Sequence, residues 1–152
     1  MEPSTLRWIT LLSRKTLVYL SSALAPYGLT AAEEPFYMAL YYAEGVTQEE
    51  LTAMVYADKA STARRVKSLE EKGLLRREKD PEDRRRNRLY LTDEAKARFG
   101  AVHRDLLELD QRLVEGLSDE DREVLGRALH RMQKNMNRVL AEQREKEGER
   151  HG

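Results

Sequence analysis

A dense group of arginines lies near the middle of the chain, in the stretch KDPEDRRRNRLYLT at residues 79–92. Four of the five positions from Arg84 to Arg88 are arginine, and Asp80, Glu82 and Asp83 precede them. Like charges held this close repel one another, and the phosphates of a polyanion relieve the repulsion. Without a polyanion the acidic residues relieve part of it, and Asp83 is placed to hold an arginine in an extended pose. The residue types therefore indicate phosphate binding.

These arginines lie between two runs that read as short strands, residues 74–78 and 88–91. The arginine segment is then the tip of a hairpin, or wing, which can follow the DNA backbone into a narrow minor groove, where negative potential attracts arginine. A charged hairpin tip on its own is also common as a solvated turn. Here it follows a predicted helix-turn-helix, and this order favours the DNA-binding interpretation. The predicted contacts of the wing are Asp83, Arg84, Arg85 and Arg86.

The helix-turn-helix is predicted from two capped helices. Thr47 opens the first with a capping-box pattern, and Asp58 opens the second, which ends at Gly73. On a helical wheel of the second helix, Val66 and Leu69 define the inward side. The other side suits the major groove, because the groove admits a helix and its base edges accept arginine and serine side chains. The predicted contacts are Ser61, Arg64, Arg65 and Ser68 for bases, and Lys59, Thr62 and Lys67 for phosphates.

Helices are predicted on both sides of this central segment, giving six helical segments and one hairpin in all. The first covers about residues 4–25, and a capping-box pattern at Thr30 opens the next. Thr92 and Ser118 open two later helices whose apolar residues step by three and four, as in a coiled-coil seam. These helices either pack against their own core or pair with a second copy in a two-fold homodimer. Pairing is favoured, because the central domain looks complete without them.

The composition restricts the class of protein. Hydrophobic residues make up 40% and charged residues 36%, as in a soluble globular chain. No apolar run approaches the roughly 20 residues that cross a bilayer. The N-terminus lacks a basic region followed by an apolar one, so we expect no secretory signal, no membrane association and a cytoplasmic location. The absence of cysteine excludes disulfides and cysteine-ligated metals.

The net charge conceals a strongly basic region. The formal net charge is zero at pH 7, which alone would argue against nucleic-acid binding. Residues 59–90, however, hold 12 basic and 6 acidic residues, a local charge of +6 that the rest of the chain balances. Such a basic region can concentrate a polyanion locally.

Catalytic and metal-binding motifs are missing from the sequence. We find no glycine-rich phosphate loop, nucleophile elbow or metal-hydrolase signature, and therefore expect neither enzymatic activity nor a cofactor. His103 and His130 stand without a partner at ligand spacing, which favours structural roles for both.

Aromatic residues are concentrated at the start of the chain, where seven of the ten lie within the first 42 positions. Tyrosine offers an apolar face and a hydroxyl, which suits a pocket for a phenol or an aromatic carboxylate. The alternative is packing in a dimer core. The predicted pocket residues are Trp8, Tyr19, Tyr37 and Tyr41.

The stretch from Thr47 to Thr92 resembles the MarR family of bacterial winged-helix transcription regulators. The matching pieces are the helix DKAST…RRVKSLEEKGLL and the wing DPEDRR…LYLT, and the flanking helices extend the resemblance to about residues 4–145. In the family motif, the wing aspartate and the arginine two residues later match Asp83 and Arg85. The recognition-helix contacts map onto Ser61, Thr62, Arg64 and Arg65.

The resemblance implies a mainly α fold with a small β-hairpin wing, a winged helix-turn-helix flanked by N- and C-terminal dimerisation helices. It further implies a homodimer whose two lobes bind a palindromic operator in double-stranded DNA, with half-sites roughly 10 base pairs apart. We therefore expect a sequence-specific transcriptional repressor. The alternative is a winged-helix protein-interaction module that does not bind DNA. Release by a small aromatic effector is one hypothesis for the aromatic residues, and packing in a dimer core is the favoured one.

The expected domain organisation follows from this plan. Residues 1–29 form the N-terminal dimerisation helix and residues 30–92 the winged helix-turn-helix. Residues 93–145 form the C-terminal dimerisation helices, and residues 146–152 a flexible tail.

Overall fold

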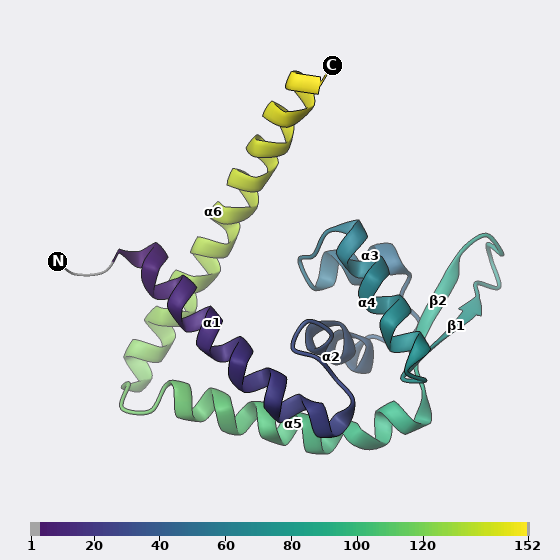
Figure 1. The fold of residues 1–152 in the computed structure, drawn as a ribbon, viewed down its shortest axis with the longest axis horizontal. Helices are drawn as coiled ribbons and strands as arrows, with labels where there is room; N and C mark the ends of the chain where they lie inside the picture. The colour runs from purple at the N-terminus through teal and green to yellow at the C-terminus, as the bar shows by residue number, and fades with distance from the viewer. Residues whose placement is uncertain (1–3, 152) are drawn as a thin grey trace. The chain divides into compact units, whose positions relative to one another are not determined.

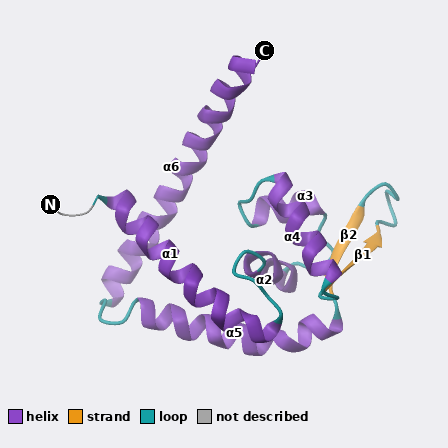
Figure 2. Ribbon diagram, viewed as in Figure 1, coloured by secondary structure: helices purple, strands orange, loops and turns teal. Residues whose placement is uncertain are grey.

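The computed structural model describes residues 4–151 and is mainly helical, with one two-stranded antiparallel sheet (Figures 1 and 2). It divides into two compact units, one ending at Leu106 and one beginning at Leu107. The predicted fold class, mainly α with a β-hairpin wing, is confirmed. The elements are α1 (Thr5–Leu24), η1 (Ala25–Tyr27), α2 (Glu34–Tyr42), α3 (Gln48–Met54), α4 (Lys59–Glu71), β1 (Leu75–Lys79), β2 (Asn87–Leu91), α5 (Asp93–Leu113) and α6 (Asp119–His151).

Side-chain caps set most of the helix starts. The hydroxyl of Thr47 accepts a hydrogen bond from the backbone N–H of Glu50, whose carboxylate accepts one in return, so the predicted capping box opens α3. The same reciprocal bonds join Thr30 and Glu33, yet α2 begins at Glu34 instead of directly after Thr30. Pro35 explains the later start, because a proline deeper in a helix would clash with the preceding turn.

The hairpin pairs β1 with β2 in one register, from Leu75 opposite Leu91 to Lys79 opposite Asn87. A further residue, Val46, bridges to Leu89 of β2 and extends this small sheet. The approach depends on Gly45, which has a φ of +77° and lies where an added Cβ would come within 3.0 Å of the Tyr90 hydroxyl. The sequence did not lead us to expect this third segment.

One apolar core joins the helices and the hairpin of the first unit. Its buried side chains come from α2, α3, α4, both strands and the start of α5, and each fully buried aliphatic or aromatic side chain contributes about 1.5–3 kcal/mol to stability. The α4 helix packs against α3 and β1 within this core (Figure 1). The predicted recognition helix and wing are therefore held in a fixed relation. Core members include Phe36, Leu40, Leu51, Val66, Leu69, Leu75, Leu89, Leu91 and Val102.

The outer helices α1 and α6 keep large apolar side chains exposed. Among the described residues, no helix is both long and apolar enough to cross a membrane. The exposed residues are Leu6, Trp8, Ile9, Leu12, Leu17, Val18 and Tyr19 on α1, and Val124, Leu125, Leu129, Met136, Val139 and Leu140 on α6.

The C-terminal helix is longer than the sequence led us to expect. We expected a flexible tail at residues 146–152, whereas α6 continues to His151. The reason is composition, since Glu, Gln, Lys and Arg are strong helix formers, and Gln143 donates a side-chain hydrogen bond to Glu147 one turn later. Residues 1–3 and 152 of the predicted terminal domains lie outside the described residues.

Candidate nucleic-acid interface

A tight turn joins α3 to α4 and completes the helix-turn-helix. Tyr56 has a φ of +53° in this turn, and Asp58 then caps α4. The Asp58 carboxylate accepts a hydrogen bond of 2.7 Å from the backbone N–H of Ser61. This bond lowers the pKa of Asp58, so the cap keeps its charge at the positive end of the helix.

The solvent side of α4 carries most of the predicted DNA contacts. Lys59, Arg64 and Lys67 are exposed, and Ser61 and Arg65 are half-buried along one flank. Lys67 lies 3.9 Å from Glu71 in a solvated pair that holds neither side chain firmly. Five of the seven side chains predicted for this helix are thus accessible.

Two side chains on α4 that were predicted to contact DNA form hydrogen bonds within the protein instead. Thr62 has no exposed surface, because its hydroxyl donates to the carbonyl of Asp58 and lies 2.9 Å from the hydroxyl of Thr52 on α3. Its role is to tie the two helices together. Ser68 donates its hydroxyl hydrogen bond to the carboxylate of Glu33, at 2.5 Å, and is not free for a base.

The base of the wing is organised by Asp80, which is 5% exposed. Its carboxylate accepts a hydrogen bond from the backbone N–H of Glu82 and pairs with the guanidinium of Arg88, each at 3.0 Å. The Glu82 bond is the main cause that lowers the pKa of Asp80. Arg88 also donates to the carbonyl of Gly45, at 2.8 Å. Sequence reasoning had assigned Asp80 only to charge relief, because register alone does not reveal which arginine turns inward.

The tip of the wing is organised by Asp83. One carboxylate oxygen accepts hydrogen bonds from the backbone N–H of Arg85, at 3.0 Å, and from its Nε, at 3.3 Å. The other oxygen lies 3.7 Å from Nε of Arg86. The side chain of Arg85 is nevertheless 92% exposed, and Arg84 is exposed beside it. The aspartate therefore orients cationic groups that remain accessible to phosphates.

An open pocket lies between the start of α3 and the wing, and polar side chains line it together with Leu89. Arg77 and Arg86 supply cationic groups to it, beside the neutral side chains of Gln48 and Asn87. The acidic Glu49 also lines this pocket, and Arg77 is paired with Glu70 at 3.0 Å, so the pocket is of mixed charge. In the part of the chain that the structure describes, no group of three His, Cys, Asp or Glu side chains could hold a metal ion.

The structure places the four residues of the predicted aromatic pocket in different surroundings. Tyr37 has no exposed surface, its hydroxyl donates to the carbonyl of Ala95 at 2.7 Å, and burial raises its pKa to about 12. Tyr41 stacks on Phe99 of α5, with ring centroids 3.3 Å apart. Trp8 and Tyr19 are instead 56% and 43% exposed on α1. Core packing accounts for Tyr37, and the stack on Phe99 was not visible from sequence.

A helix-turn-helix with a basic exposed face, followed by an arginine-bearing hairpin, defines a winged-helix DNA-binding protein. Residues 38–86 match the family model described as "MarR family". YdgJ of Bacillus subtilis (strain 168), an uncharacterized HTH-type transcriptional regulator, is 30% identical over 114 residues, which are 75% of this chain and 70% of that protein. The chain belongs to the MarR family of transcriptional regulators.

Two solved structures extend the comparison. A MarR transcriptional regulator from Methanosarcina mazei Go1 is 30% identical and has a TM-score of 0.75, over 86% of this chain and 94% of that one. The S. aureus MepR protein, solved as a complex with DNA, has a TM-score of 0.80 over 88% of this chain and 96% of that one. At 21% identity the MepR likeness concerns the fold.

Proposed function

We propose that this regulator is a homodimeric repressor that binds a palindromic operator in double-stranded DNA and acts without catalysis or a cofactor. One observation carries the proposal. The recognition helix α4 and the strands of the wing pack on one apolar core, and Arg64 of α4 and the arginines of the wing are exposed on the surface. The helix would read base edges in the major groove while the wing follows the backbone. Lys59, Ser61 and Arg65 complete the helix contacts, and Asp83, Arg84, Arg85 and Arg86 those of the wing.

The exposed apolar side chains of α1 and α6 support dimerisation. A monomer that left both rows in water would expose large apolar areas, and burial against a second copy removes them from water. A two-fold dimer presents two equivalent lobes, which requires a palindrome with half-sites roughly 10 base pairs apart. In this proposal residues 4–29 and 93–145 dimerise and residues 30–92 bind DNA, in the cytoplasm.

Repression follows from occupancy of promoter DNA, and an effector must prefer a lobe arrangement that mismatches the operator. We assign a small aromatic effector to the partly exposed rings around Phe99. Tyr41 and Tyr42 are 38% and 66% exposed. His103 stacks on the ring of Phe99, with ring centroids 5.4 Å apart. A thermal-shift screen with aromatic carboxylates tests this assignment; no stabilisation at millimolar concentration would count against it.

The main experiment is selection from a random duplex library, followed by titration of the enriched duplex at two salt concentrations. We expect an enriched palindrome that is bound by a dimer, with affinity falling steeply as salt rises, because neutralised phosphates release counterions. The rival function is a protein-interaction module whose basic surface binds an acidic partner. No enrichment together with a flat salt dependence would favour that rival.

A further inference from the structure

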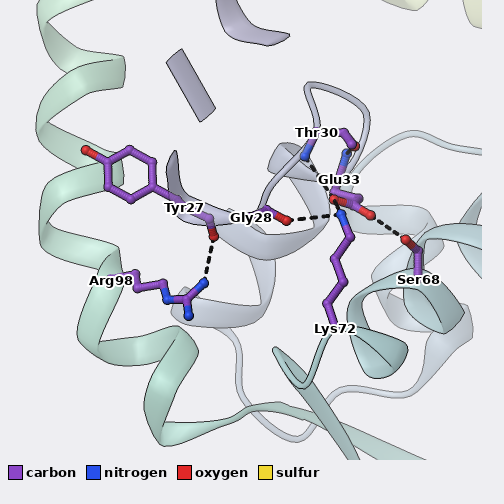
Figure 3. A network of polar contacts seen from close by, with 7 residues as sticks. All are labelled: Tyr27, Gly28, Thr30, Glu33, Ser68, Lys72 and Arg98. Atoms are coloured by element: carbon purple, nitrogen blue, oxygen red, sulfur yellow. Dashed lines mark hydrogen bonds and ion pairs between the residues drawn. The ribbon is translucent and has the colours of Figure 1, made fainter. Parts of the chain in front are cut away.

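A carboxylate is buried beside the recognition helix. Glu33 lies just before α2, and only 1% of its surface is exposed. One oxygen accepts a 2.5 Å hydrogen bond from the hydroxyl of Ser68, and the other accepts bonds from Nζ of Lys72, at 2.7 Å, and from the backbone N–H of Thr30, at 2.9 Å. Figure 3 shows these donors converging on the carboxylate from two separate segments of the chain.

The same contacts reach the first part of the connection between α1 and α2, residues 25–30, which is called the linker below. Nζ of Lys72 also donates to the carbonyl of Gly28, at 3.0 Å, and so bridges the linker and the Glu33 carboxylate. From the other side, Arg98 of α5 donates to the carbonyl of Tyr27, at 2.9 Å (Figure 3). The Tyr27 hydroxyl donates to Asp105 of α5. The linker is therefore fastened to α4 on one side and to α5 on the other.

The pKa of Glu33 indicates that the contacts in this cluster are strong. Burial alone would raise the pKa of Glu33, but the hydrogen bonds from Lys72, Ser68 and Thr30 outweigh it, and the pKa is lowered. Glu33 is therefore ionised and paired at neutral pH. The pair is buried on the Glu33 side only, because Lys72 is 35% exposed, and an ion pair of this kind adds little stability over apolar packing. The pair is better explained by the geometry that it imposes.

That geometry concerns the helix that would enter the major groove. Ser68 and Lys72 stand one turn apart at the C-terminal end of α4, on the same flank as Ser61 and Arg65. Ser61 and Arg65 stay accessible, whereas Ser68 and Lys72 are bound to Glu33 and the linker. One flank of the helix thus divides into a half available to DNA and a half anchored to the chain.

We infer that Glu33 is a positioning residue for DNA binding: it fixes the recognition helix α4 to the linker after α1, and thereby sets the direction in which each lobe presents that helix. The inference rests on the proposed homodimer and palindrome. If the tie is loosened, each lobe still carries every DNA-contacting side chain, but the two recognition helices no longer have a fixed separation. Affinity for the best spacing then falls, and spacing matters less.

The first test uses the free protein and needs no DNA. Glu33→Gln keeps the volume of the side chain but turns an amide toward Lys72, while Glu71→Gln, on the exposed side of α4, makes the same charge change in water. Hydrogen exchange should accelerate over the C-terminal half of α4 and the linker in Glu33→Gln, and stay at the wild-type rate in Glu71→Gln. Equal protection in both variants would overturn the tie.

The second test measures affinity for the selected duplex and for versions with one or two base pairs inserted between the half-sites. Relative to Glu71→Gln, we expect Glu33→Gln to bind the best duplex about tenfold more weakly, within the range of couplings carried by packed networks. It should also discriminate less between spacings, with an unchanged salt slope, because no phosphate contact is lost. Unchanged affinity and an unchanged spacing ratio would overturn the positioning role.

Ser68→Ala separates positioning from direct contact and guards against misfolding of the first variant. If the Ser68 hydroxyl serves only to hold α4 to Glu33, its removal should weaken binding to all DNA sequences alike. If the hydroxyl contacts a base directly, its removal should instead relax the base preference at one operator position, and this result would overturn our assignment. Wild-type protein that prefers no duplex over random DNA would refute the proposed function and the positioning role with it. Hydrogen exchange would then still decide whether the structural tie exists.

Discussion

Two clusters of opposite charges in this protein, the wing tip and the surroundings of Glu33, behave in contrasting ways. At the wing tip, Asp83 contacts Arg85 and Arg86 at 3.0–3.7 Å, and the arginine side chains are 92% and 66% exposed. Around Glu33, the carboxylate is 1% exposed and three donors lie within 2.9 Å. Water surrounds the wing arginines, whereas the Glu33 carboxylate is buried and its partner Lys72, 35% exposed, reaches the solvent.

The contrast shows that charged residues on the surface and charged residues bound to a buried partner have different roles. The wing arginines lose little by exchanging water for phosphates, so they are suited to binding DNA. Lys72, although basic and at the C-cap of the recognition helix, is already bound to Glu33 and to Gly28. Basic residues counted from sequence are therefore not equivalent.

The largest expected effect is on stability, from Glu33→Ala. The substitution leaves Lys72 without its partner ion and removes the acceptor of Ser68 and Thr30. We expect a loss of about 2 kcal/mol in the free energy of unfolding, because the donors of Ser68 and Thr30 lose their acceptor, whereas the ammonium of Lys72, which is 35% exposed, is solvated by water. Urea unfolding measures it, with the exposed Glu71→Ala as control. If Glu33→Ala lowers the free energy of unfolding no more than Glu71→Ala does, the Glu33 cluster stabilises the fold no more than an exposed ion pair, and the proposed difference between the two clusters is wrong.

The pH dependence of the same contribution has a definite sign. The folded-state pKa of Glu33 is lowered below its ordinary value of 4.5, so its ionised form stabilises the folded state. The stability difference between wild type and Glu33→Gln should be full above pH 4.5 and disappear as pH falls through the folded-state pKa. Unfolding curves at several pH values test this; a difference that grows in acid would contradict the assignment.

Among the DNA contacts, Arg64→Ala should have the largest effect on specificity. An arginine that pairs with a base edge contributes about 1–3 kcal/mol at a single operator position. Titration of duplexes that carry each single base change would locate that position. Equal losses on operator and random DNA would show that Arg64 does not read sequence.

Arg85→Ala should have a smaller and more uniform effect. Its side chain is accessible at the wing tip, where contacts depend on the backbone and on groove shape. We expect a loss of about 1 kcal/mol on operator and random DNA alike, and a salt slope smaller by about 1. Titration at several salt concentrations measures both quantities, and a sequence-dependent loss would argue for base contact instead.

The smallest expected effect is that of Asp83→Ala on stability. Exposed ion pairs contribute about 0–1 kcal/mol, and both partners of Asp83 are largely solvated. Urea unfolding should therefore place this variant close to wild type. A loss as large as that of Glu33→Ala would mean that the wing cluster is structural, and the contrast would fail.

Much of the fold followed from local sequence. Capping residues such as Thr47 and Asp58 predicted the starts of α3 and α4, because a cap acts within one turn. Val66 and Leu69 predicted the buried face of α4, since helical periodicity is also local. Pro35 indicates that α2 starts late, and the length of α6 follows from the high helix propensity of its residues.

The errors at the site arose from contacts between distant residues. A helical wheel placed Ser68 on the free side, but its partner Glu33 lies 35 positions earlier. Thr62 stands between the two faces on the wheel, and its burial depends on Thr52 of the neighbouring helix. Trp8 and Tyr19 are aromatic like Tyr37 but differ from it in their surroundings. Only three-dimensional packing decides such cases.

The most direct test of this account compares the two clusters on one duplex over a range of salt concentrations. The wing variant R84Q/R85Q/R86Q should bind with a salt slope reduced by about 2–3, because phosphate contacts are lost. Glu33→Gln should bind more weakly than wild type with the wild-type slope, because only the direction of the helix has changed. A wing variant that keeps the wild-type slope would contradict the assignment of the wing to DNA.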